Sequence, residues 1–162
     1  MIKGNVWKYG DDVNTDVIFP GKYTYTISDP KEMAQHALED LDPTFASECQ
    51  KGDIVVGGEN FGCGSSREQA PISIREAGAS CIIAKSFARI FFRNAINAGL
   101  LVITSADAVD AVEKGDTIEI DTDKGLILAS GQTFNYPPLA PEVAEILECG
   151  GLIEYTKMKM NA

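Results

Sequence analysis

The segment from residue 62 to 71, GCGSSREQAP, combines the groups that an anion-binding site needs. Its two glycines let the backbone approach a ligand closely, and two hydroxyls and the guanidinium of Arg67 follow at once. Ser65 and Glu68 have the spacing of a helix capping box, so a helix is predicted to begin near Ser65 or Ser66. The first amides of such a helix favour a carboxylate, a phosphate or an alkoxide.

The same pattern also has a simpler interpretation, because short capping motifs are common in proteins. In that interpretation Ser65 only caps the helix and Arg67 is exposed to solvent. In the anion-site interpretation, Arg67 contributes a planar fork of donors that suits a carboxylate. The local pattern alone leaves both interpretations open.

Hydrophobic periodicity predicts that this motif connects a strand to a helix in an α/β fold. The run from residue 53 to 103 predicts a parallel βαβαβ unit. Right-handed crossovers then place the glycine turn at the carboxyl end of the first strand, where open α/β sheets bind ligands. The predicted elements of this run are 53–56, 66–78, 80–84, 87–98 and 100–103.

The flanking segments predict further elements around this unit. A strand is predicted at 4–9, and a helix capped by Asp29, with Pro30 at its first position, is predicted to run to about residue 41. A long polar loop separates the two. Downstream, the sequence predicts a small hairpin and a short helix, with strands at 117–120 and 126–129 and the helix at 141–149. We expect one domain over residues 1–155 and a frayed tail at 156–162.

Composition and charge restrict the classes of function. The 162 residues are 44% hydrophobic, which is enough for one domain with a substantial core. A formal net charge of −10, without a long basic run, argues against a nucleic-acid or anionic-membrane surface. The chain begins without an apolar signal-peptide core, and no apolar run approaches the ~20 residues of a membrane span, so we expect a cytoplasmic protein.

The cysteines and the single histidine form no recognisable metal motif. The four cysteines, at 49, 63, 81 and 149, include no C-x-x-C pair. We therefore expect incidental or buried thiols and no metal or cofactor bound by this chain. His36, between glutamates of a predicted amphipathic helix, is expected to be a surface residue.

Three segments in a fixed order resemble the swivelling domain of the aconitase superfamily. They are NTDVI at 14–18, GENFGCGSSRE at 58–68 and KSFARIF at 85–91. In length and motif order the chain is similar to the free-standing small subunits of the 3-isopropylmalate dehydratase family. The resemblance covers most of residues 2–103 and is weaker in the hairpin and the final helix. It implies an α/β fold, a three-layered swivelling β/β/α domain like aconitase domain 4, with the βαβαβ parallel sheet as its core.

The resemblance also implies an activity. Such a chain is the small subunit of a heteromeric hydro-lyase that isomerises a 2-alkylmalate, foremost 3-isopropylmalate and 2-isopropylmalate, by dehydration and rehydration. The family's large subunit carries a [4Fe-4S] cluster that acts as a Lewis acid on the hydroxyl group, and the swivelling domain supplies the base. By motif position, Ser65 matches the serine base, Ser66 and Arg67 match residues that hold a substrate carboxylate, and Asp16 matches an active-site aspartate. For Asp16, a turn-forming role is the simpler alternative.

A serine hydroxyl acts as a base only if its pKa is lowered greatly. Each pKa unit requires about 1.4 kcal/mol of preference for the charged form. A helix N-terminus contributes at most ~2 kcal/mol, or about one and a half units. The helix alone cannot activate Ser65, so backbone amides, Arg67 and exclusion of water by the large subunit must act together. We therefore expect the isolated chain to be inactive.

Substrate selectivity is expected in the recognition loop, residues 20–26, with the sequence PGKYTYT. In the family, an arginine in the third place of a Tyr-Leu-Arg-type segment marks members that bind a third carboxylate. Here Tyr25 takes that place and Thr24 replaces the leucine, which favours an alkyl substituent because a buried carboxylate without a partner is unstable. Lys22 could still reach the substrate as a cation. Gln69 stands where the family has histidine, and it can hydrogen-bond but cannot titrate.

Several alternatives remain at this point. The substrate could instead be 2,3-dimethylmalate or methylmalate (citramalate), or the chain could serve a homoaconitate hydratase. In a different class, the chain could be a non-catalytic assembly module or lid that closes over another subunit's active site. A phosphohistidine carrier would need a reactive histidine in the glycine turn, and RNA binding has no support in so acidic a chain.

Overall fold

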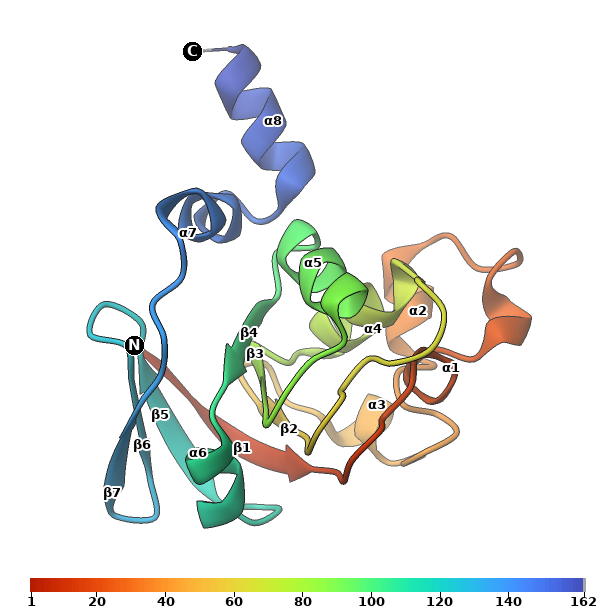
Figure 1. Ribbon diagram of the computed structural model, residues 1–162. Coiled ribbons are helices and arrows are strands. Elements are labelled where there is room, and N and C mark those ends of the chain that lie inside the picture. The colour runs from red at the N-terminus through yellow and green to blue at the C-terminus, as the bar shows by residue number, and fades with distance from the viewer. Residues whose placement is uncertain (162) are drawn as a thin grey trace.

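Seven strands form one sheet in the computed structural model, which describes residues 1–161 (Figure 1). Their order across the sheet is β4-β3-β2-β1-β5-β6-β7. Neighbours among β4, β3, β2 and β1 are parallel, and neighbours from β1 to β7 are antiparallel. The strands are β1 (Ile2–Lys8), β2 (Ile54–Val56), β3 (Cys81–Ala84), β4 (Leu101–Thr104), β5 (Thr117–Asp121), β6 (Leu126–Ala129) and β7 (Gln132–Asn135).

Helices cover both faces of the parallel half. On one face α4 packs against α1, α2 and α5, and on the other α6 contacts β3 and β6. The two last helices, α7 and α8, both contact α5, and α8 extends away from the sheet (Figure 1). The helices are α1 (Thr15–Ile18), the 3-10 turn η1 (Gly21–Tyr23), α2 (Pro30–Ala34), α3 (Phe45–Glu48), α4 (Gln69–Ala77), α5 (Arg89–Asn97), α6 (Ala106–Ala111), α7 (Pro141–Glu148) and α8 (Leu152–Met160).

Two apolar clusters result, one on each face of the sheet. Successive side chains of a strand point to opposite faces, so Val55 and Ile82 pack with residues of α4 and α5. Their neighbours Ile54 and Ile83 pack with α6 and the inner side of β5 and β6. The antiparallel half therefore lies over the parallel half and supplies a third layer. The predicted three-layered α/β fold with a βαβαβ core is confirmed.

The predicted helix from Pro30 to about residue 41 is wrong in its second half. Asp29 does cap α2, accepting a hydrogen bond from Lys31 N at 3.1 Å, but the helix ends at Ala34 and gives way to turns. Leu38 has φ 56 and is fully buried, and its amide donates to Ile18 O at 2.7 Å. A tertiary contact thus outweighs the local helix pattern.

The expected polar loop after β1 is also more ordered than its composition indicates. It contains α1 and η1, and Ile18 and Phe19 within it are fully buried. His36, expected at the surface, is half-buried and pairs its Nδ1 with Glu39 Oε1 at 2.9 Å. These contacts place the first third of the chain against α4, beside the glycine turn.

The C-terminal part extends the predicted pattern. The hairpin of β5 and β6 is present, and β7 lengthens it into a three-stranded antiparallel unit. The sequence-based boundary at residue 155 falls inside α8, and Ala162, the end of the expected tail, lies outside the described residues. Across residues 1–161, no helix is long and apolar enough to span a membrane.

Candidate active site

Hydrogen bonds hold the glycine turn against the segment that follows β1. Gly62 N donates to Val13 O at 2.7 Å, and Thr15 N donates to Cys63 O at 2.8 Å. The Thr15 hydroxyl donates to Ser65 O at 2.8 Å, across 50 positions of sequence. The turn therefore lies where the chain leaves β1 and β2 at their carboxyl ends, as the topology predicts.

Gly62 is the position in this turn that least tolerates a side chain. Its φ is +83°, in the region that favours glycine. A Cβ atom there would lie 2.1 Å from Cγ of Phe91, which is buried on α5. The turn and α5 can therefore approach this closely only because residue 62 is glycine.

Replacing Gly62 with alanine is expected to lower the free energy of unfolding by about 2–4 kcal/mol, because overpacking adds to backbone strain. Gly115→Ala is the matched control, since Gly115 has φ +93° and no atom within 4 Å of the added methyl. Gly115→Ala should therefore lose only the free energy that backbone strain at positive φ removes, about 1 kcal/mol. Urea denaturation of both variants measures the difference, and equal losses would show that the Phe91 contact contributes nothing.

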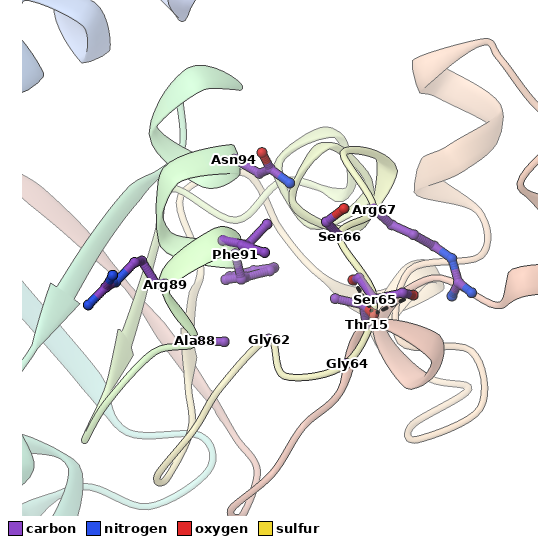
Figure 2. Close-up of a pocket in the computed structure, with 11 residues that line it drawn as sticks. Thr15, Gly62, Gly64, Ser65, Ser66, Arg67, Ala88, Arg89, Phe91 and Asn94 are labelled. Carbon is purple, nitrogen blue, oxygen red and sulfur yellow. Dashed lines mark hydrogen bonds between the residues drawn. The ribbon is translucent and has the colours of Figure 1, made fainter.

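Ser65 and Ser66 are exposed on this turn, next to unpaired backbone donors. The Ser65 Oγ lies 3.4 Å from Thr15 Oγ1, and the two side chains meet in Figure 2. Within residues 1–161, the amides of Ser65 and Ser66 have no protein acceptor. An anion placed beside Ser65 would meet these amides without displacing a protein group.

The predicted helix start at Ser65 or Ser66 is wrong, and so is the capping box. The helix α4 begins at Gln69, and no side chain caps it. Ser65 is instead held by Thr15, and Arg67 N donates to Ser65 O at 3.0 Å, which keeps the chain in a tight turn. The helix dipole acts within about one turn, so it contributes less at Ser65 than a helix starting there would.

Arg67 is held by Asp16 across the start of α1. Its Nη1 pairs with the Asp16 carboxylate and lies 3.4 Å from Phe19 O. The Arg67 side chain is 19% exposed, whereas that of Asp16 is 66% exposed. Gly21 leaves space for the pair, because a Cβ there would lie 2.9 Å from Arg67 Nη2. Arg67 therefore extends away from Phe91 and Asn94, as Figure 2 shows.

A cavity of about 210 Å³ lies between the turn and the start of α5 (Figure 2). It brings together three of the six predicted site residues, Ser65, Ser66 and Arg67. Thr15 and Asn94 also line it, although neither was among the predicted site residues. Thr15 lies in the NTDVI segment, so its place in that motif was the available signal. The remaining lining residues are Gly62, Gly64, Ala88, Arg89, Ile90 and Phe91.

The recognition loop lies beside this cavity without lining it. Tyr25 is 99% exposed, and Thr24 is half-buried with a hydroxyl that has no partner among residues 1–161. Lys22 folds back over its neighbour, with Nζ 5.2 Å from the centre of the Tyr23 ring. The structure therefore leaves Tyr25 as the most accessible side chain of the loop.

The thiols are not arranged for metal binding. Burial raises the pKa of Cys49 to about 12 and also raises the pKa of Cys81, so both remain protonated near neutral pH. Cys63 precedes the serines and is half-buried. In the part of the chain that the structure describes, no group of three or more His, Cys, Asp or Glu side chains could hold a metal ion.

Comparison with known proteins agrees with this architecture. Residues 13–108 match the model of the aconitase C-terminal domain family. The 3-isopropylmalate dehydratase small subunit of Caldanaerobacter subterraneus is 52% identical over 162 residues, covering 99% of this chain and 100% of the relative. The protein of the same name from Caldicellulosiruptor bescii is 53% identical over 163 residues, covering 99% and 98%.

A solved structure also matches the chain over nearly its whole length. The crystal structure of 3-isopropylmalate dehydratase (leuD) from Methanocaldococcus jannaschii superimposes with a TM-score of 0.92 at 46% sequence identity. The match covers 98% of this chain and 95% of that one. The glycine turn with its two serines, the seven-stranded sheet and these relatives together show that the chain belongs to the aconitase C-terminal domain family and, within it, to the 3-isopropylmalate dehydratase small subunits.

Proposed function

We propose that this chain is the small subunit of a heteromeric hydro-lyase that interconverts 2-isopropylmalate and 3-isopropylmalate in leucine biosynthesis. The names of relatives about 50% identical over the whole chain support the reaction. The observation that carries the site is an exposed Ser65 hydroxyl beside unpaired amides, on a turn fixed by hydrogen bonds to Val13 and Thr15. Such donors stabilise an alkoxide at Ser65 in the way that an oxyanion hole does.

Ser65 acts as the base in both directions of this reaction. Its alkoxide takes the proton from the carbon next to a carboxylate, hydroxide leaves the neighbouring carbon, and an alkene acid forms. Hydroxide then adds to the carbon that lost the proton, and Ser65 returns its proton to the carbon that lost the hydroxyl group, which regenerates the alkoxide. A helix terminus supplies little of the required pKa shift at this distance, so the turn amides and exclusion of water supply the rest.

Ser66 and Arg67 bind a carboxylate of the substrate, and Asp16 orients the Arg67 guanidinium through their ion pair. The guanidinium has five N–H donors, so it can accept a second carboxylate while Asp16 keeps one side of the fork. The exposure of Asp16 allows the pair to rearrange as the substrate enters. This arrangement orients the acid so that its α-carbon faces Ser65.

A large subunit closes the site and completes it. Ser65 and Ser66 are exposed in the isolated chain, and a catalytic alkoxide needs a water-excluded site. A [4Fe-4S] cluster held by that subunit would supply the Lewis acid that binds the leaving hydroxyl group. The present chain contributes the base and the carboxylate-binding groups, and we expect no turnover from it alone.

Coexpression with a candidate large subunit under anaerobic conditions tests this function. The purified complex is assayed with 3-isopropylmalate, citramalate, 2,3-dimethylmalate and homocitrate. We expect the highest kcat/KM for 3-isopropylmalate, because Tyr25 offers no positive charge to a third carboxylate. Preference for homocitrate would contradict the proposed substrate class.

Replacing Tyr25 with arginine is expected to raise kcat/KM for homocitrate at least about 10-fold relative to that for 3-isopropylmalate, because the new cation pairs with a third carboxylate. Tyr25 is fully exposed, so folding should be unaffected. Lys22→Arg is the control, since Lys22 lies over the Tyr23 ring in the same loop. If the ratio is the same in both variants, Tyr25 does not read the substrate.

A further inference from the structure

We propose that Gln69 positions the recognition loop relative to the catalytic turn and thereby sets the affinity for the substrate. The inference rests on the proposed function, since it concerns how the same site recognises the alkyl substituent of the substrate. Gln69 is the first residue of α4, two positions after Arg67. It therefore belongs to the segment that carries the carboxylate-binding groups.

The side-chain amide of Gln69 points at the loop backbone. Its Nε2 donates to Thr24 O at 2.8 Å and makes a longer contact with Ile27 O at 3.5 Å. An amide nitrogen has two protons, so both can be directed at these carbonyls. The two acceptors flank Tyr25, the exposed side chain that we expect to face the substrate.

The opposite side of the loop is held independently. The rings of Tyr23 and His36 lie 4.0 Å apart between centres, and the Tyr23 hydroxyl lies 3.5 Å from Glu39 Oε1. Within the loop, Thr24 N donates to Gly21 O at 3.1 Å. Tyr23 thus fixes the loop to the turns after α2, and Gln69 fixes it to the catalytic turn.

The chemistry of these contacts requires a donor at position 69. Two carbonyl oxygens face the side chain, so glutamine stabilises the loop and an isosteric carboxylate would repel it. The contact is also independent of pH, because an amide does not titrate. Gln69→Glu therefore removes the donors with almost no change of shape, and Gln69→His retains one ring N–H.

The first test measures hydrogen exchange in the isolated chain. Without the Gln69 donors, amides of residues 22–27 should exchange about 5-fold to 10-fold faster in Gln69→Glu, because loop opening becomes more favourable. Gln132→Glu introduces the same charge change at an exposed position of β7 and should leave the exchange of this segment unchanged. Equal exchange in the wild-type chain and Gln69→Glu would overturn the proposal.

The second test uses the complex with the large subunit. We expect Gln69→Glu to raise KM for 3-isopropylmalate about 10-fold with kcat within about 3-fold, because substrate binding is lost but the base is intact. The preference for 3-isopropylmalate over citramalate should shrink, and Gln69→His should recover most of the loss. Unchanged KM and preference, or a fall in kcat alone, would contradict the role in recognition.

The two tests also separate this proposal from the proposed function. Failure of the wild-type complex to convert any of these acids would contradict the function and with it the recognition role. The exchange measurement would still decide whether Gln69 holds the loop. Faster exchange together with a higher KM and a smaller preference supports the whole inference.

Discussion

Replacing Ser65 with alanine should lower kcat of the reconstituted enzyme at least about 10³-fold and leave KM within about 3-fold, because a general base contributes 10²–10⁴-fold to the reaction but little to ground-state binding. The alanine removes one oxygen atom from an exposed position, so stability should hardly change. Ultraviolet absorbance of the alkene acid gives the dehydration rate. Binding and chemistry are thus separated in one experiment.

Ser66→Ala is the internal control for that experiment. Both serines are exposed on the same turn, but Ser66 is expected to contact the carboxylate and not the reacting proton. Its loss should raise KM about 10-fold to 100-fold, the effect of one hydrogen bond to a charged group. Near-normal turnover by Ser65→Ala would instead identify the chain as an assembly module or lid.

Arg67→Lys should raise KM at least about 100-fold, because lysine keeps the charge but loses the planar fork that binds a carboxylate. The fork is also what Asp16 holds, so the pair is expected to act as a unit. Steady-state kinetics of the complex with 3-isopropylmalate measures the effect. A KM within 2-fold to 3-fold of the wild-type value would mean that Arg67 does not bind the substrate.

Asp16→Asn distinguishes binding from folding in the same pair. Because Asp16 is 66% exposed, the ion pair contributes at most about 1 kcal/mol to stability, and the melting temperature should change little. The KM should rise about 10-fold, since the guanidinium loses its orientation but keeps its charge. In the double variant Asp16→Asn/Arg67→Lys, the two increases in KM should not add. Both substitutions act on the same carboxylate-binding group, the guanidinium of Arg67.

The parallel core could be predicted because its signals are local and strong. The strands predicted at 53–56 and 80–84 differ from β2 and β3 by one residue at their starts. Each is a short apolar run bounded by turn residues. Strands buried on both faces favour such runs, so composition alone identified them.

The site turn could be predicted in identity but not in conformation. Ser65 with Glu68 has the spacing of a capping box, and nothing local distinguishes a cap from a tertiary turn. The deciding contact comes from Thr15, 50 positions earlier, whose hydroxyl donates to Ser65 O. Likewise, Leu38 leaves the helical conformation because its amide donates a hydrogen bond to Ile18 O. The hydrophobic periodicity of the sequence gives no sign of this contact.

The Gln69 contact shows a different limit. In the sequence, position 69 departs from the family's histidine, and because glutamine does not titrate this argued against a role in proton transfer. In the structure, the Gln69 side chain donates a hydrogen bond to the carbonyl of Thr24, 45 positions earlier. Its role is therefore to hold the recognition loop in position. A residue's chemistry could be read from the sequence, but its partner could not.

The main-chain bonds between the glycine turn and the segment after β1 also affect how the two subunits meet. Because Gly62 and Thr15 make these bonds in the free chain, the turn needs no ordering upon association. Encounter should then resemble rigid-body docking, with a rate limited by diffusion and orientation. Since the chain carries a formal net charge of −10, that rate should depend on ionic strength far more than the rate of dissociation does.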